Sequence, residues 1–93
     1  MSTAPRAQLE VRTVLVTWRS VMRQIHDGRL PGTAESVYRV TSRALAELDN
    51  VATAHAADAR SERSALETDL SAARREIKQA RDAWTADEDE RAG

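Results

Sequence analysis

Hydrophobic residues recur every three or four positions along most of this chain, which is the spacing of amphipathic α-helices. Within the first segment they are Val11, Val14, Leu15, Trp18, Val21, Met22 and Ile25. Pro5 suits the first turn of a helix, and Gly28 suits the left-handed position that follows a helix end. The sequence therefore predicts a first helix over residues 4–27 and a tight turn over 28–33.

The longer second segment contains neither Gly nor Pro from Thr33 to about Ala86. Thr33 is a good N-cap residue, so we expect a second, very long helix over residues 34–86. Four consecutive carboxylates follow, and negative charge is unfavourable at the C-terminal end of a helix dipole. Residues 87–93 are therefore predicted to form a frayed acidic tail.

A helical wheel places the apolar residues of the second segment on one continuous stripe. With about 100° between successive residues, the stripe is roughly 160° wide from Val37 to Val51 and roughly 80° wide in the second half of the helix. An alanine-rich waist without bulky aliphatic side chains, residues 52–65, separates the two parts. Because alanine favours helix, the waist either stays helical and admits a close neighbour or forms a weakly packed, solvated bend, and both interpretations remain open.

The length of the second helix implies association. About fifty helical residues would span roughly 80 Å, twice what the first helix could cover, so half of the apolar stripe would have no partner within the chain. We therefore predict an all-α fold in a single domain of residues 1–93: a helical hairpin with one short and one very long helix, assembled as a coiled coil or helical bundle. The predicted oligomer interface comprises Leu48, Val51, Ala59, Leu66, Leu70, Ala73, Ile77, Ala80 and Trp84.

Two dimers fit this pattern. In an antiparallel dimer, each narrow half lies against the partner's hairpin and completes a three-helix bundle. In a parallel dimer, the hairpins form a four-helix bundle and the narrow halves form a two-stranded coiled coil. The antiparallel dimer is slightly favoured because it covers the wide and narrow faces together.

Two polar residues, His55 and Glu62, interrupt the stripe at the waist. An antiparallel crossing near Ala59 would pair them between subunits as a polar seam that fixes the register and responds to pH. The simpler alternative is that the waist is wet and both side chains reach water.

Composition supports association and restricts the chemistry. The 93 residues include 17 alanines and no phenylalanine, and so small a chain with few bulky core residues usually needs disulfides, a metal or oligomerisation. Cysteine is absent, which excludes disulfides and thiolate metal sites. No apolar run is long enough for a signal peptide or a membrane span, so we expect a cytoplasmic protein that does not associate with membranes.

The sequence contains no recognisable catalytic or cofactor-binding motif. It has no Walker glycine loop, no nucleophile elbow and no His-Glu-x-x-His. Its two histidines, His26 and His55, would lie far apart in a hairpin. We therefore expect no enzymatic activity, no cofactor and no metal site.

Three arginines form a basic stripe on the first helix, outside its apolar sector. Arg12, Arg19 and Arg23 fall within about 40° of one another and could contact phosphates or an acidic protein surface. An ordinary solvated helix face is the simpler interpretation, because the net charge is only −1 and no aromatic residue lies between the arginines to stack on bases.

Together these features predict a non-catalytic oligomerising module that acts as a structural scaffold or an interaction partner, with a homodimer as the favoured assembly. One alternative is a nucleic-acid-associated helical protein that uses the basic stripe, although the near-neutral charge argues against a nucleic-acid partner. The other is an adaptor whose exposed half-helix docks on a different protein.

Overall fold

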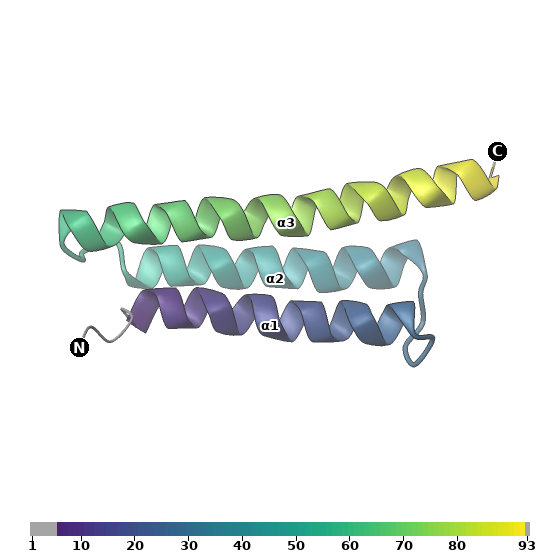
Figure 1. Ribbon diagram of the computed structural model, residues 1–93, viewed down its shortest axis with the longest axis horizontal. Coiled ribbons are helices and arrows are strands. Elements are labelled where there is room, and N and C mark those ends of the chain that lie inside the picture. Colours follow the sequence, from purple (N-terminus) through teal and green to yellow (C-terminus); the bar gives the residue numbers. More distant parts are fainter. Residues whose placement is uncertain (1–5, 93) are drawn as a thin grey trace.

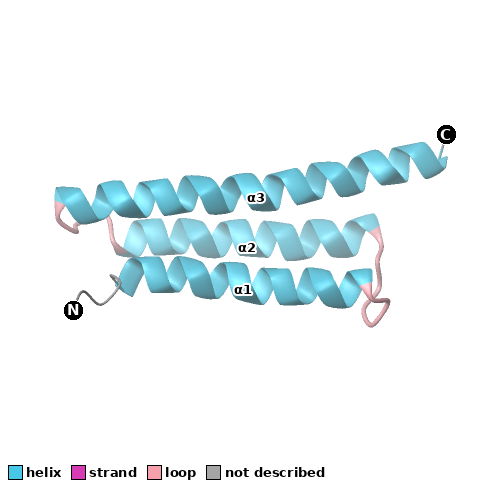
Figure 2. Ribbon diagram, viewed as in Figure 1, coloured by secondary structure: helices cyan, strands magenta, loops and turns pink. Residues whose placement is uncertain are grey.

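The computed structural model describes the backbone of residues 6–92 and the side chains of residues 6–84. It contains three helices of 21, 21 and 33 residues: α1 (Arg6–His26), α2 (Ala34–Ala54) and α3 (Arg60–Ala92). The chain reverses at both connections, and each helix packs against the other two (Figures 1 and 2). The result is an up-down-up bundle that measures 50 × 23 × 19 Å.

The predicted single long helix is wrong, because the chain leaves the helix at residues 55–59 and α3 runs back along α1 and α2. The fold is therefore a three-helix bundle and not a two-helix hairpin. α3 continues to Ala92 instead of ending near residue 86, and its last turns project beyond the α1–α2 turn (Figure 1). The side chains of the predicted acidic tail, and residues 4 and 5 of the predicted first helix, lie outside the described residues.

The prediction for the α1–α2 turn is confirmed. Gly28 has a left-handed backbone, with φ of 80°. Its N–H donates to the Ile25 carbonyl at 3.1 Å and the Arg29 N–H donates to the Gln24 carbonyl at 2.8 Å, which together make a Schellman motif. Thr33 caps α2, since its Oγ1 accepts the Ser36 N–H at 3.1 Å. Local hydrogen bonds thus define both sides of this turn.

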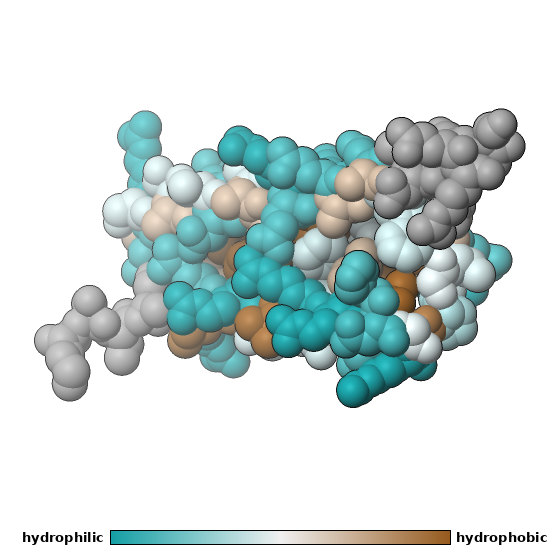
Figure 3. Space-filling view, turned by 45° about the vertical axis from the view of Figure 1, so that its right-hand side comes forward, coloured by the Kyte–Doolittle hydropathy of each residue, from teal (hydrophilic) through white to brown (hydrophobic). Residues whose placement is uncertain are grey.

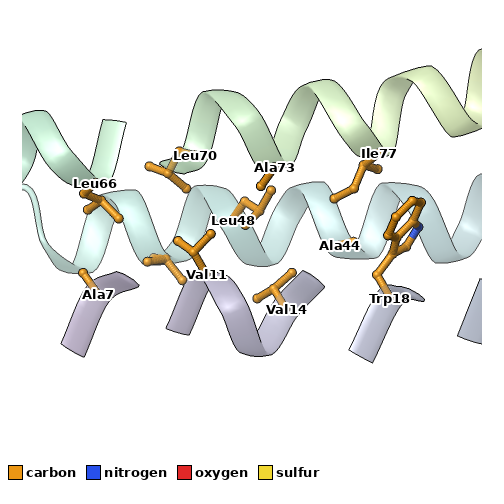
Figure 4. Packing of buried hydrophobic residues seen from close by; sticks show 11 residues of the cluster. Ala7, Val11, Val14, Trp18, Ala44, Leu48, Leu66, Leu70, Ala73 and Ile77 are labelled. Carbon is orange, nitrogen blue, oxygen red and sulfur yellow. The ribbon is translucent and has the colours of Figure 1, made fainter. Parts of the chain in front are cut away.

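All three helices contribute to one continuous hydrophobic core (Figure 4). The side chains of α3 point toward α1 and α2, and Leu48 of α2 and Ile77 of α3 are completely buried between the helices. The buried members of the cluster are Ala7, Val11, Val14, Trp18, Ala44, Leu48, Val51, Leu66, Leu70, Ala73 and Ile77.

Most of the predicted oligomer interface lies inside this core, which corrects its assignment. Leu48, Val51, Leu66, Leu70, Ala73 and Ile77 are buried within the chain. Ala80 and Trp84 are partly buried, and the Trp84 ring lies beside Gly32 at the α1–α2 turn, whereas Ala59 is exposed. The stripe that we expected to pair with a second molecule packs instead against the chain's own hairpin.

Burial of this stripe outweighs the helix propensity of the waist. Burying a Leu or Ile side chain stabilises a fold by about 1.5–3 kcal/mol, and Leu66, Leu70 and Ile77 all become buried when α3 folds back. When residues 55–59 leave the helix, the chain loses only a few tenths of a kcal/mol of helix-propagation free energy per residue. Packing therefore decides the fold: residues 55–59 of the waist become a turn, and the rest of the waist stays helical.

We expect Leu48→Ala to lower the free energy of unfolding by about 2–5 kcal/mol, because it leaves a cavity in a fully buried position shared by the helices. Urea denaturation followed by circular dichroism measures this loss. Tyr38→Ala is the control, since Tyr38 is 64% exposed and its truncation should change stability by less than about 0.5 kcal/mol. Similar losses for both variants would contradict the packing described above.

Thr41→Val should raise the free energy of unfolding by about 1 kcal/mol. Thr41 is 1% exposed, its Oγ1 has no hydrogen-bond partner, and removal of an unsatisfied buried hydroxyl is favourable. Thr53→Val is the matched control, because the exposed Thr53 hydroxyl donates to the Asp49 carbonyl at 3.0 Å. Destabilisation by Thr41→Val, measured in the same urea titration, would show that the hydroxyl is satisfied.

Candidate functional site

Within residues 6–84, no group of three or more His, Asp or Glu side chains is arranged to hold a metal ion. None of the helices, over their described residues, is long and apolar enough to cross a membrane. Two other features have a specific geometry: a groove between α1 and α2, and a hydrogen-bonded histidine at the α2–α3 turn.

The first feature, the α1–α2 groove, consists of two adjoining hollows on the bundle surface that share Val14 and Glu47. One hollow, of about 310 Å³, is lined mainly by apolar atoms and has Trp18 and Val40 in its walls. The other, of about 340 Å³, is also mainly apolar and is bordered by Leu9. Neither hollow has a lining residue from α3, so this groove belongs to the α1–α2 pair alone.

The local sequence explains why the groove stays open. The side chains that line its floor and walls include many small ones, Val, Ala and Thr, which leave space between two packed helices. Leu9 is 45% exposed at its edge. A space-filling view of one face shows smaller apolar areas between hydrophilic residues (Figure 3). The groove therefore offers apolar contact within a polar surface.

Charges of both signs border the α1–α2 groove. On α1, Arg6 Nε lies 3.6 Å from Glu10 Oε1, and on α2, Arg43 Nε lies 3.4 Å from Glu47 Oε1. All four residues line the groove, and each charged group has an opposite charge one helical turn away. The rim is therefore electrically balanced and favours neither a strongly acidic nor a strongly basic ligand.

The predicted basic stripe is only partly available. Arg19 forms two hydrogen bonds with the Glu76 carboxylate, at 2.6 and 2.7 Å, which tie α1 to α3. Arg12 and Arg19 line a hollow of about 500 Å³ together with Asp69 and Glu76, so acidic residues share their surface. Arg23 is exposed. This arrangement weakens the case for phosphate binding, because two carboxylates face the same side.

We expect a double-mutant cycle of Arg19→Gln and Glu76→Gln to give a coupling of about 0.5–1 kcal/mol near neutral pH. The hydrogen bonds from Arg19 lower the pKa of Glu76 below its usual 4.5. The coupling should therefore be complete above pH 4.5 and disappear as the pH falls through the lowered pKa. Arg39 and Glu35, 3.2 Å apart on the exposed surface of α2, provide a control cycle with a smaller coupling. Coupling that persists in strong acid would contradict the ion pair.

The second feature is the His55 clasp, which consists of His55, Glu10 and Asp58. His55 caps the C-terminal end of α2, and its side chain is only 16% exposed. Its Nδ1 lies 2.9 Å from Asp58 Oδ2 in the same turn, and its Nε2 lies 3.0 Å from Glu10 Oε2 on α1. The clasp therefore connects the α2–α3 turn to the first turns of α1.

His55 thus has carboxylate partners, but not the one that the sequence predicts. Glu62 is exposed on α3, and the continuous seam on which a His55–Glu62 pair was expected is interrupted by the turn. Asp58 was not predicted as a partner, although its position three residues after His55 is a local signal for such a contact. Glu10 lies 45 residues away along the chain, and only the reversal at residues 55–59 brings it close to His55.

Comparison of the chain with protein-family models, with curated proteins and with solved structures finds no match. Its function is therefore argued from the groove, the clasp and the surface charges.

Proposed function

We propose that this chain is a non-catalytic interaction module that associates with a second copy of itself through the α1–α2 groove. The observation that carries the proposal is the groove itself: a mainly apolar surface between the antiparallel helices α1 and α2, with no lining residue from α3. Two such surfaces facing each other would bury α1 and α2 of both copies in a four-helix arrangement.

The charge of the rim favours a second copy over a partner of one charge sign. Arg6, Glu10, Arg43 and Glu47 carry no net charge together, but each helix supplies both signs. A two-fold axis places one surface against a reversed copy of itself, which allows arginines to meet carboxylates. A uniformly acidic or basic partner would face repulsion from half of the rim.

The size of the surface sets the expected strength of association. Two helices of 21 residues lying side by side, each roughly 30 Å long and about 10 Å wide, present a face of roughly 600 Å². Two such faces bury about 1,200 Å² together. This total is the lower limit for stable dimers, which bury about 1,200–2,000 Å². We therefore expect a weak dimer whose population depends on protein concentration and whose chains fold before they associate.

Thr17→Arg tests this proposal, because Thr17 is exposed, lines the groove and would place a long charged side chain in the interface. Thr68→Arg is the matched control on the exposed face of α3. We expect light scattering to show that the mass of the unmodified protein and of Thr68→Arg rises from monomer to dimer as concentration increases through the micromolar range, while Thr17→Arg stays monomeric.

The folded state of all three proteins is checked by circular dichroism. A monomer at every concentration up to about 1 mM would remove the homodimer and leave a different protein as the occupant of the groove. A dimer that Thr17→Arg does not weaken would place the interface elsewhere on the bundle.

A further inference from the structure

The position of His55 between two carboxylates favours the doubly protonated form of its ring. A neutral imidazole carries one N–H, so it can donate to one carboxylate and must turn a lone pair toward the other. An ionised carboxylate accepts hydrogen bonds and cannot donate one, and this holds for both Glu10 and Asp58. The two contacts of 2.9 and 3.0 Å, on opposite ring nitrogens, therefore favour the imidazolium ion, which donates from both nitrogens.

We propose that His55 is a proton-dependent clasp: the doubly protonated ring holds the α2–α3 turn against α1, and loss of one proton loosens this end of the bundle. Deprotonation leaves the ring with a single N–H. One of the two hydrogen bonds is then replaced by repulsion between a nitrogen lone pair and a carboxylate. The Glu10–His55 hydrogen bond joins α1 to the turn, so weakening it loosens the connection between two elements that are distant in sequence.

The surrounding charges favour the imidazolium form. Glu10 from α1 and Asp58 from the turn are in direct contact with the ring, and the other Glu10 oxygen faces Arg6. On α3, Arg63 and Glu67 line a hollow of about 190 Å³ together with His55. The opposite charges of Arg63 and Glu67 largely offset each other, which leaves the two contacting carboxylates as the dominant influence.

The pKa of His55 is consequently raised above its usual 6.5, chiefly by the hydrogen bond to Glu10 and against the opposing effect of burial. A raised pKa in the folded state means that the clasp contributes fully at pH values below about 6.5 and is lost as the pH rises through the pKa of the folded protein. The loosened state thus belongs to pH values above the raised pKa of His55 in the folded protein.

The turn depends on the clasp because its own residues supply little else to hold it. Its other side chains are Ala56, Ala57 and Ala59, all exposed, and Ala59 precedes α3 without a side-chain oxygen to cap it. The backbone contributes hydrogen bonds within the turn, such as the Asp58 N–H to the His55 carbonyl at 3.1 Å. These bonds shape the turn but do not connect it to α1.

NMR on the whole chain tests the clasp directly. Titration of the His55 ring from pH 5.5 to 8.0 should give a midpoint above 6.5, with both ring nitrogens protonated below it. Over the same range, the amide protection factors of Asp58 and of Arg63, whose N–H donates to the Ala59 carbonyl, should fall with that midpoint. The Val37 amide, bonded to Thr33 at the opposite turn, is the internal reference and should keep its protection factor.

Three variants separate the clasp from general effects of pH. Glu10→Gln should lower the His55 midpoint and shift the loss of protection with it. His55→Gln should abolish the pH dependence at the turn, whereas His26→Gln, which changes the exposed histidine at the other end of α1, should leave it unchanged.

A His55 midpoint at or below 6.5, or turn protection that does not change with pH in the unmodified chain, would overturn the proposal. An unshifted midpoint in Glu10→Gln would do the same, since it would show that Glu10 does not hold the ring. Because Glu10 also lines the α1–α2 groove, the same titration on Thr17→Arg, the variant expected to stay monomeric, shows whether the pH dependence of the turn is independent of dimer formation.

Discussion

Packing of the apolar face of α3 against the α1–α2 pair is the interaction on which the rest of this structure depends. It buries Leu66, Leu70 and Ile77, and in doing so it completes the core around Leu48. Because α3 must reverse direction to reach the hairpin, the same packing imposes the turn at residues 55–59. This turn brings His55 into contact with Glu10. The position of α3 also leaves the groove between α1 and α2 uncovered.

The local features of this fold could be predicted from the sequence, and the topology could not. Gly28 and Thr33 act through hydrogen bonds to residues three to five positions away, so the sequence defines the α1–α2 turn almost completely. The reversal after α2 has no comparable signal, because the waist contains alanines that are good helix formers and neither Gly nor Pro. Whether the chain reverses depends on two free energies, that of burying the apolar face of α3 and that of extending α2 as one helix. Helix propensity alone favours the single long helix, which the structure does not have.

The same limit applies to the candidate sites. The wheel correctly identifies the apolar face of α3 but cannot show whether that face meets another molecule or the same chain. His55 was recognisable as a polar residue on this stripe, yet its tertiary partner depends on the reversal. Arg19 belongs to a basic stripe in the sequence, whereas in the bundle it is bound to Glu76 of α3. In each case, the residue is identified locally and its role is set by a neighbour that is distant in the chain.

The two ends of the bundle are held by different physical means. At the α1–α2 turn, backbone hydrogen bonds, the Thr33 cap and the Trp84 ring beside Gly32 involve no group that changes charge near neutral pH. At the α2–α3 turn, the connection to α1 uses ionised side chains. Glu10 belongs both to the clasp and to the wall of the α1–α2 groove. The groove therefore reaches the same end of the bundle as His55. The bundle is therefore asymmetric: uncharged contacts hold the α1–α2 turn, and ionised side chains connect the α2–α3 turn to α1.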